Sequence, residues 1–497
     1  MDQYHRPSGS AARGTSSRTA PLRAFLAALL TVGGTLAVAL QQAPFTASGS
    51  SRADADNRPN VLLILTDDMA RTDLRWMPET RRLIQNRGVT STGFVSNHPM
   101  CCPARAEILT GQYAQNNGVH HNKGVFGGYP SLKSPDNNLG SWLRSTGYRT
   151  AFVGKHLNGW ETTRDHQGGW TVFNPILGNI YGAYDLTMFR NGNPATYRGV
   201  HTADLMGELT TRYIKRFSDS GAPFFIWTNQ VPPHDMFVNG RFRPPVPAIR
   251  HNFLYRDAMP PSLSDPAFNE ADVSDKPAWV RQRSPVSKKR VISLHRARIR
   301  SLRAVDDQVR AAVRTLRETG ELANTYIVFA SDNGFQLGEH RTVGKNKPYE
   351  ESLQVPFLVR GPGIPVGAVR TGMFGMADVA PTIAAMAKVQ PGRPVDGRSM
   401  LPFLRRGGTP YSHYLIQGGA DDADWWWRGV RSQDHVYVRY AATGAEELYD
   451  RRSDPHQLVN LAGDPAHREV KQEYADRLAR LEHCAGASCR TGGAPES

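Results

Sequence analysis

The chain has 497 residues and a formal net charge of +15, with 60 lysines and arginines against 45 acidic residues. This length allows a large core and about two domains, which excludes a short single-motif module. An excess of positive charge attracts polyanions such as sulfated polysaccharide or nucleic acid. However, the sequence has no recognised nucleic-acid-binding motif and its arginines are scattered. We therefore expect most of them to be solvated surface, and no nucleic-acid partner.

Residues 1–47 have the pattern of a secretory signal peptide. Four arginines precede an apolar run, Ala24–Leu40, and small and polar residues follow it. An uncleaved anchor is the alternative, because the run approaches transmembrane length. No second long apolar stretch follows, so the sequence predicts a secreted, extracellular protein without a stable membrane span after signal cleavage. Removing residues 1–47 leaves a formal charge of +12, and residues 48–58 are a polar linker.

The cysteines fit export and not zinc binding. Cys484 and Cys489 bracket a short polar segment, which predicts a small-loop disulfide. Cys101 and Cys102 are adjacent, and a bridge between neighbours needs strained geometry, so we expect both to be unpaired. Zinc is not expected, because no second Cys/His pair has ligand spacing.

The first predicted strand ends in a pair of carboxylates. Val61–Leu65 is a continuous apolar run, typical of a strand that is buried on both faces of a parallel sheet. Asp67 and Asp68 follow it, at the edge where open α/β sheets bind ligands. Adjacent carboxylates repel each other, and oxygen ligands favour a hard cation, Ca²⁺ or Mg²⁺. The alternative is a helix N-cap, which explains one aspartate but not the pair.

The segment from Cys101 to Gly111 predicts an anion site. Pro103 disfavours helix at the preceding residue, so we expect the cysteines in an extended or turn segment and a helix from Ala104 that Gly111 ends. A helix N-terminus presents unsatisfied N–H groups in a positive field, and Arg105 adds a fixed charge. The alternative is a pair of buried thiols, or one half of a surface disulfide, near a helix start.

Three further buried strands each lead to polar side chains that suit a site. A lysine and a histidine can bind an anion and transfer a proton, and an Asp-Asn pair can bind the same cation as the first carboxylates. Taken alone, the lysine and histidine after the first of these strands are equally ordinary surface residues, and the Asp-Asn pair is better explained by a tight turn. The strands are 148–153, 223–228 and 326–330, followed respectively by Lys155 and His156, by His234, and by Asp332 and Asn333.

The rest of the chain predicts helices, an insertion and a second, smaller domain. Apolar residues recur every three or four positions over 299–316, which indicates an amphipathic helix. Residues 236–293 have little periodicity, and we interpret them as an insertion over the sheet edge that contacts substrate. Alternating runs after residue 410 predict antiparallel strands, and 467–481 predicts a last helix. We expect a catalytic domain at 59–400 and an α+β domain at 401–497.

Taken in order, these motifs resemble the sulfatase family. The chain has Cys-x-Pro-x-Arg followed by Leu-Thr-Gly, and also Gly-Lys, Pro-Pro-His, Ser-Asp-Asn-Gly and Gly-Lys-x-x-x-Tyr-Glu-Glu, over roughly residues 57–465. The Cys-Cys-Pro run, the Gly-Lys-x-Leu-Asn form and the segment 269–277 are similar to the N-acetylglucosamine-6-sulfatase branch. One departure is that many sulfatases have Gly-Lys-x-His, whereas Leu157 holds that position and His156 directly follows Lys155.

The resemblance implies a fold, a cofactor and residue roles. The fold is α/β: an alkaline-phosphatase-like large mixed sheet flanked by helices, with a smaller C-terminal antiparallel-sheet domain. Cys101 is the residue that a formylglycine-generating enzyme oxidises, and Cys102 is the intervening residue. The implied catalytic and substrate-binding residues are Cys101, Arg105, Lys155, His156, His234 and Lys345, and the implied Ca²⁺ ligands are Asp67, Asp68, Cys101, Asp332 and Asn333.

The resemblance also implies a sulfate-ester substrate, with a sulfated sugar or polysaccharide as the candidate class. Two alternatives stay open at this point. A phosphonate or phosphodiester hydrolase on the same scaffold is one, since sulfate and phosphate have similar shapes. A non-catalytic binder of sulfated polymer is the other, favoured by the basic charge.

Overall fold

The structure is a computed structural model that describes residues 56–238, 240–421 and 423–493. The predicted signal peptide and most of the predicted linker lie outside these residues. Across the described part of the chain, no helix is long and apolar enough to cross a membrane.

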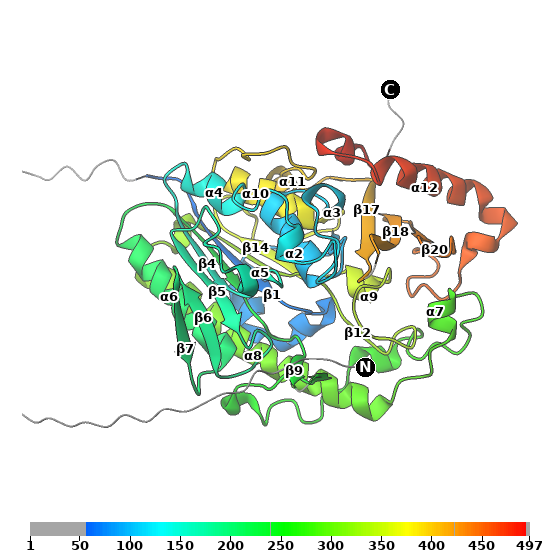
Figure 1. The fold of residues 1–497 in the computed structure, drawn as a ribbon, viewed down its shortest axis with the longest axis horizontal. Coiled ribbons are helices and arrows are strands. Elements are labelled where there is room, and N and C mark those ends of the chain that lie inside the picture. The colour runs from blue at the N-terminus through cyan, green and yellow to red at the C-terminus, as the bar shows by residue number, and fades with distance from the viewer. Residues whose placement is uncertain (1–55, 239, 422, 494–497) are drawn as a thin grey trace, which may run out of the picture. The chain divides into compact units, whose positions relative to one another are not determined.

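A mixed sheet forms the centre of the described fold (Figure 1). Its five central strands, from β11 to β5, are parallel, and antiparallel strands flank them on both sides. Among the described residues it has ten strands, in the order β15 (Ala368–Arg370), β2 (Val89–Ser91), β14 (Phe357–Arg360), β11 (Thr325–Ser331), β1 (Asn60–Thr66), β8 (Phe224–Asn229), β4 (Arg149–Gly154), β5 (Val172–Gly178), β6 (Leu186–Arg190) and β7 (Asn193–Tyr197).

Helices cover both faces of this sheet (Figure 1). In β1, Val61, Leu63 and Leu65 pack with one apolar cluster, whereas Leu62 and Ile64 pack with another. The prediction of a strand buried on both faces is therefore confirmed. The helices on the first face include α2 (Cys101–Thr110), α4 (Leu139–Arg144) and α10 (Val379–Met386), and those on the second include α1 (Pro78–Leu83), α6 (Thr202–Ser218) and α8 (Lys288–Glu318).

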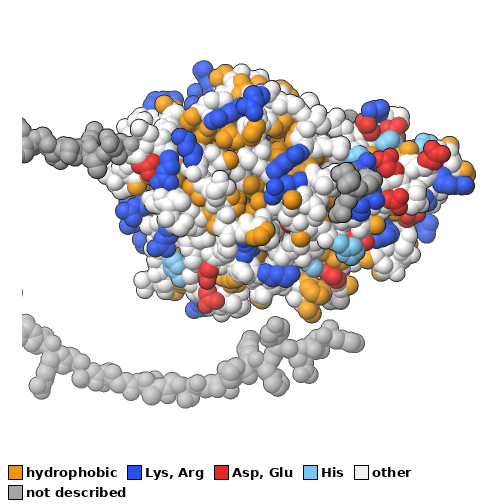
Figure 2. All heavy atoms as spheres, turned by 90° about the horizontal axis from the view of Figure 1, so that it is seen from above, with side chains coloured by type: hydrophobic (Ala, Val, Ile, Leu, Met, Phe, Trp, Pro, Cys, Tyr) orange, Lys and Arg blue, Asp and Glu red, His pale blue; other side chains and the backbone are white. Residues whose placement is uncertain are grey.

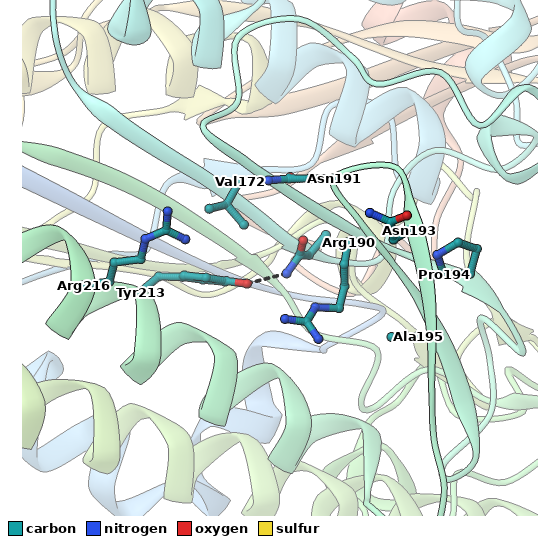
Figure 3. A pocket seen from close by; sticks show the side chains of 9 residues that line it. Val172, Arg190, Asn191, Asn193, Pro194, Ala195, Tyr213 and Arg216 are labelled. Carbon is teal, nitrogen blue, oxygen red and sulfur yellow. Dashed lines mark hydrogen bonds between the residues drawn. The ribbon is translucent and has the colours of Figure 1, made fainter.

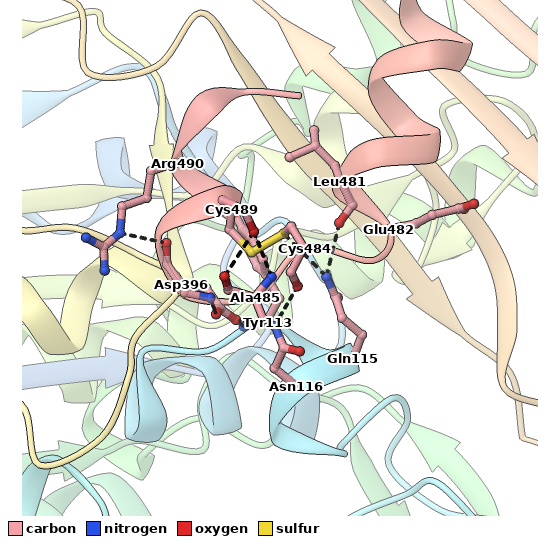
Figure 4. Close-up of a disulfide and its surroundings, with 12 residues drawn as sticks. Tyr113, Gln115, Asn116, Asp396, Leu481, Glu482, Cys484, Ala485, Cys489 and Arg490 are labelled. Atoms are coloured by element: carbon pink, nitrogen blue, oxygen red, sulfur yellow. Dashed lines mark hydrogen bonds between the residues drawn. A yellow bond between two sulfur atoms is a disulfide. The ribbon is translucent and has the colours of Figure 1, made fainter. Parts of the chain in front are cut away.

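A separate antiparallel sheet lies near the C-terminus, as the sequence predicted. In the residues that the structure describes it has four strands, β17 (His413–Gly419), β18 (Trp425–Ser432), β19 (His435–Tyr440) and β20 (Glu446–Asp450). Helix α12 (Arg468–Leu481) packs against β18 and β19. The predicted disulfide between Cys484 and Cys489 follows α12 (Figure 4).

Shorter elements connect these layers. The predicted insertion at 236–293 contains a two-stranded hairpin, a short helix and the start of α8, which begins earlier than the periodic residues indicated. The remaining elements are β3 (Phe94–Val95), α3 (Ala114–Asn117), α5 (Trp160–Thr163), β9 (Met236–Val238), β10 (Arg241–Arg243), α7 (Ala278–Arg281), β12 (Gln336–Leu337), β13 (Val343–Gly344), α9 (Glu350–Leu353), β16 (Phe374–Gly375) and α11 (Leu401–Arg406).

Candidate active site

The two predicted carboxylate segments meet at one edge of the sheet. Strands β1 and β11 are parallel neighbours, and the last residue of each is paired in register, so Asp67 and Asp68 emerge beside Asp332 and Asn333. The Asp68 backbone N–H donates to Asp332 Oδ1 at 3.1 Å, and Asn333 Nδ2 donates to Asp68 Oδ1 at 2.7 Å. All four side chains are buried. The register of the two strands thus builds one compact set of oxygen atoms.

Cys101 faces this set from the first turn of α2. Its Sγ lies 3.1 Å from Asp67 Oδ1 and 3.8 Å from Asp68 Oδ1. Burial, and then the Asp67 carboxylate, raises the pKa of the Cys101 thiol well above its usual value. The unmodified side chain is therefore a poor nucleophile, since the thiolate is the reactive form.

The expected helix start was wrong. Helix α2 begins at Cys101 and includes Cys102, and Gly111 ends it in the left-handed conformation, as expected. Pro103 is the third helical residue, where the missing N–H costs nothing because the first four N–H groups of a helix have no partner within it. Both cysteines are free and buried. Cys102 points elsewhere, and its Sγ accepts the Asn158 N–H at 3.2 Å.

Arg105 lies one turn into α2 and holds the site together. Its Nε donates to Asp332 Oδ2 at 2.8 Å, and one terminal nitrogen donates both to Asn229 Oδ1 at 2.8 Å and to the Lys155 carbonyl at 3.1 Å. The other terminal nitrogen lies 3.6 Å from Asp67 Oδ2. The guanidinium therefore links the ends of β1, β4, β8 and β11.

Two lysines bring further positive charge to the carboxylates. Lys155, which follows β4, is fully buried and forms an ion pair with Asp67. Lys345, which follows β13, forms an ion pair with Asp68, and its Nζ donates to Cys101 Sγ at 2.7 Å. Although burial opposes it, Lys155 holds the pKa of Asp67 well below its usual value, with smaller effects from His234 and Arg105.

His234 approaches the same carboxylates after β8. Its Nε2 lies 3.6 Å from Asp68 Oδ2, and its Nδ1 lies 2.5 Å from the Asp235 carbonyl oxygen. A carbonyl only accepts, so Nδ1 is the protonated nitrogen of the neutral ring. Burial lowers the pKa of His234 to about 4, against the opposing effect of Asp68. The ring is neutral near pH 7 when no anion is bound.

His156 lies apart from this group. Its ring packs among aromatic side chains, and burial followed by the Arg105 charge lowers its pKa to about 3. The rings that it contacts are those of Tyr129, Phe152, Trp160 and Phe173. The catalytic role predicted for His156 stays a prediction, because no described contact joins it to the carboxylates.

The donor set fits a hard cation. Ligand atoms of Asp67, Asp68, Cys101 and His234 all lie within 4.8 Å of one another. Asn333 Oδ1 is buried and has no hydrogen-bond partner among the described residues. An unpartnered buried carbonyl oxygen is costly unless a ligand satisfies it. Carboxylate and amide oxygens are the ligands that Ca²⁺ uses.

A cavity of about 750 Å³ opens above these groups. Lys345 and His234 contribute to its wall, so a ligand in it reaches the site. Aromatic side chains form much of the remainder, and a loop after β17 closes one side. The other lining residues are Met100, His121, Asn122, Lys123, Asn158, Tyr181, Phe237, Phe242, Asn346, Gly419, Ala420, Asp421 and Trp426.

Two residues of the site were not predicted from the sequence. Asn229, the last residue of β8, accepts from Arg105, and its position at a strand end was the signal that would have found it. The Tyr181 ring stacks on His234 at 4.4 Å and lies 4.7 Å from Lys155 Nζ. Tyr181 lies in a segment without a motif, so the sequence alone had no signal for it.

The comparisons identify the family. The family model for Sulfatase matches residues 59–389, and the one for N-sulphoglucosamine sulphohydrolase, C-terminal, matches residues 338–484. The chain belongs to the sulfatase family. It is a sulfuric ester hydrolase, and its large mixed sheet with helices has the alkaline-phosphatase-like fold that the sequence predicted. The family assignment made from the sequence motifs is thus confirmed.

Individual relatives agree with this assignment. An arylsulfatase of Volvox carteri is 32% identical, with 88% of this chain and 76% of the relative covered. The N-acetylglucosamine-6-sulfatase of Homo sapiens is 29% identical, with 94% and 90% covered. A solved structure in complex with its substrate D-glucosamine-2-N,6-O-disulfate has a TM-score of 0.72 at 22% identity, with 86% and 97% covered. At this identity the solved structure supports the fold alone.

Proposed function

We propose that this sulfatase is secreted, depends on Ca²⁺ and on a formylglycine made from Cys101, and removes sulfate from sulfated amino sugars. One observation carries the proposal. Cys101 Sγ, the facing carboxylates of Asp67 and Asp68, and the amines of Lys155 and Lys345 converge in one buried site that opens into a cavity.

The proposed Ca²⁺ ligands are Asp67, Asp68, Asp332, Asn333 and the modified residue 101. The unpartnered Asn333 Oδ1 and the close grouping of ligand atoms from Asp67, Asp68 and Cys101 support this set. When bound, the ion would stabilise negative charge on the sulfuryl oxygens. The bound ion would also offset the repulsion between the adjacent carboxylates of Asp67 and Asp68.

Formylglycine at position 101 would, once hydrated, supply one hydroxyl as nucleophile and a second through which sulfate is expelled. The register supports Cys101 as the modified residue, since Pro103 and Arg105 stand two and four positions later. A formylglycine-generating enzyme is then a required partner during maturation. Arg105 is held by Asp332 and Asn229, so it would orient that side chain rather than rotate toward the substrate.

The chain's own residues then bind the sulfate and handle the proton. Lys155 and Lys345 would place two ammonium groups on the sulfuryl oxygens, in a buried site where such charges act strongly. A bound anion would raise the pKa of His234 and let Nε2 hold a proton for the departing alcohol. Tyr181, stacked on the ring, would fix its orientation.

The substrate class follows from the cavity and the relatives. The cavity volume of about 750 Å³ accommodates a sugar, and aromatic side chains such as Trp426 and Phe242 offer faces for a pyranose ring. Relatives named N-acetylglucosamine-6-sulfatase align over most of the chain. We therefore propose 6-O-sulfated N-acetylglucosamine as the preferred group over small aryl sulfates.

Comparison of kcat/KM for 6-O-sulfated N-acetylglucosamine and for an aryl sulfate tests the substrate assignment. A tenfold preference for the sugar, or about 1.4 kcal/mol of transition-state discrimination, is the expected result. A kcat/KM that is tenfold or more higher for the aryl sulfate would contradict the sugar assignment but leave the sulfatase class unchanged. Phosphate and phosphonate analogues of both compounds test the alternative hydrolase activity.

Asp332→Ala tests the metal assignment. Elemental analysis should find Ca²⁺ in the wild type and little in the variant, with turnover lowered at least about 100-fold, as for a lost metal or outer-shell ligand. Asp378→Asn is the matched control, because Asp378 is equally buried but accepts from Tyr411 and Tyr414 instead. Full calcium occupancy in Asp332→Ala would contradict the proposed ligand set.

A further inference from the structure

A second cavity, of about 320 Å³, lies where helix α6 meets strands β5, β6 and β7 (Figure 3). We call it the arginine pocket, after Arg190 and Arg216. It shares no lining residue with the active-site cavity. The other lining residues are Val172, Asn174, Asn191, Asn193, Pro194, Ala195 and Tyr213.

The lining of the arginine pocket is cationic and polar. None of its lining residues is acidic, and three of them are asparagines. In Figure 3 the Tyr213 ring lies between the guanidinium groups of Arg190 and Arg216. Neither arginine forms an ion pair with any described residue. Arg212, one turn earlier on α6, is paired with Glu208 at 2.6 Å, so the two arginines of the pocket differ from their neighbour.

The floor of the pocket is fixed by hydrogen bonds. Asn174 Nδ2 donates to the Tyr213 hydroxyl, and both side chains are buried. Asn191 Oδ1 accepts the Phe173 N–H at 2.6 Å, which holds the turn between β6 and β7 against β5. These bonds hold the backbone segments that carry Arg190 and Arg216, while both arginine side chains are exposed. This preorganisation lowers the entropy cost of binding a ligand.

We propose that the arginine pocket binds a sulfo group of a sulfated polysaccharide, at a sugar other than the one being desulfated. Guanidinium groups bind tetrahedral oxyanions through two parallel N–H donors, and two of them here face no acidic partner. The volume of about 320 Å³ admits a sulfated sugar residue. The choice of a sulfated polymer rests on the proposed function. The pocket lies toward the edge of the sheet where the parallel strands begin, so it would hold a distant part of a long substrate whose end enters the active site.

The experiment compares two double variants. Arg190→Ala/Arg216→Ala removes the pocket's charges, and Arg212→Ala/Arg314→Ala removes two charges that pair with glutamates on their own helices. We expect the first to weaken affinity for a size-defined heparin oligosaccharide about tenfold at low salt and the second by no more than about twofold. The kcat/KM for a sulfated monosaccharide should be unchanged in both.

Several outcomes overturn the proposal. Equal losses in the two double variants would show a general effect of charge, and wild-type binding of chemically desulfated heparin or of polyphosphate as tight as that of heparin would exclude a sulfo-specific pocket. Arg190→Lys/Arg216→Lys keeps both charges but loses the paired N–H donors, so it should weaken the affinity by at least about threefold. Wild-type affinity in this lysine variant would contradict the guanidinium contacts, which keeps the test valid if the alanine variant does not fold. The heparin measurement needs no turnover, so it still tests the pocket if the proposed activity fails.

Discussion

The buried site balances three carboxylates against three cations. Asp67, Asp68 and Asp332 face Lys155, Lys345 and Arg105, while burial keeps His234 neutral. Without a ligand this set has no net charge. A divalent cation would therefore make the site positive and favour an anionic sulfate ester, and it would loosen the hold of the carboxylates on the two lysines.

The two adjacent cysteines give the sharpest prediction at the scale of single residues. Cys101→Ala should abolish turnover, because residue 101 alone faces the carboxylates and Lys345. Cys102→Ser should keep most of the activity, because the hydroxyl can still accept the Asn158 N–H. Turnover of both variants and the mass of the peptide that contains residue 101 are the measurements. An equal loss of turnover in both variants would contradict the assignment of Cys101 as the modified residue.

Lys347 gives a prediction about pH. It lies 4.2 Å from the Trp426 ring and 5.3 Å from the Trp279 ring, and burial followed by the Arg283 charge lowers its pKa to about 7. The unfolded chain keeps the ordinary value near 10.5, so between pH 7 and 10 it binds more protons than the folded chain. The free energy of unfolding should therefore rise with pH in this window, by up to about 1.4 kcal/mol per pH unit.

The control for this pH effect is Lys347→Met, which keeps the volume and removes the titration. Urea unfolding of wild type and variant at several pH values isolates the contribution of Lys347, since the other titrating groups are common to both proteins. The free energy of unfolding of the wild type should rise relative to that of Lys347→Met as the pH increases from 7 to 10. A difference that stays constant from pH 7 to 10 would show that Lys347 keeps its ordinary pKa.

At the scale of elements, helix α8 holds two loops of the active site in place through Arg298. Arg298 on this helix is fully buried and donates to the carbonyls of Asp68 and Pro233, the latter at 3.2 Å. It also lies 3.6 Å from Asp73 Oδ2. One side chain therefore fixes both the proposed metal loop and the loop that carries His234, although it touches no reacting group.

Arg298→Lys tests this positioning role. The lysine keeps the charge beside Asp73 but cannot span both carbonyls, so we expect kcat/KM to fall about 10- to 100-fold through misplacement of the two loops. The loss should appear mainly in kcat, and thermal stability should fall only slightly. Arg314→Lys on the same helix is the control, because Arg314 is exposed and paired with Glu318. Wild-type kinetics in Arg298→Lys would reject the role.

The elements also show what the sequence determines. The buried strands β1, β8 and β11 were predictable because continuous apolar runs need two covered faces, and the site residues follow these strands directly. The start of α2 was not predictable from the rule that proline disfavours helix at the preceding residue, because the first turn of a helix accommodates a proline such as Pro103. Strands β5–β7 were missed, since β7 is an exposed edge strand with little apolar pattern. Contacts such as Tyr181 on His234 depend on this missed region.

At the scale of the whole molecule, the C-terminal part shares a core with the large sheet. Tyr414, Leu448 and Leu478 belong to the same apolar cluster as Val61 of β1. Cationic side chains are scattered over the face seen in Figure 2, as the sequence predicted for solvated arginines. The division at residue 400 stays a prediction, and the shared cluster leads us to expect that residues 59–400 do not fold stably alone.

The chain's C-terminal segment is also tied to the segment that follows helix α2, which carries Cys101 (Figure 4). Asp396 accepts from the Tyr113 N–H at 2.7 Å, just after α2, and from the Gly486 N–H at 2.7 Å, inside the disulfide loop. Asn116 Nδ2 donates to the Cys484 carbonyl at 2.9 Å. These bonds hold the loop in place independently of the disulfide.

Cys484→Ser/Cys489→Ser should therefore lower the free energy of unfolding by only about 2 kcal/mol, the value for so short a closed loop. Turnover should be unchanged, because the hydrogen bonds to Asp396 and Asn116 remain. Asp396→Leu should cost more, since it leaves the N–H groups of buried Tyr113 and of part-buried Gly486 without an acceptor. Urea unfolding of the three proteins gives both values. A larger loss in the disulfide variant than in Asp396→Leu would show that the covalent bond, and not the buried carboxylate, holds the C-terminal segment to the active-site helix.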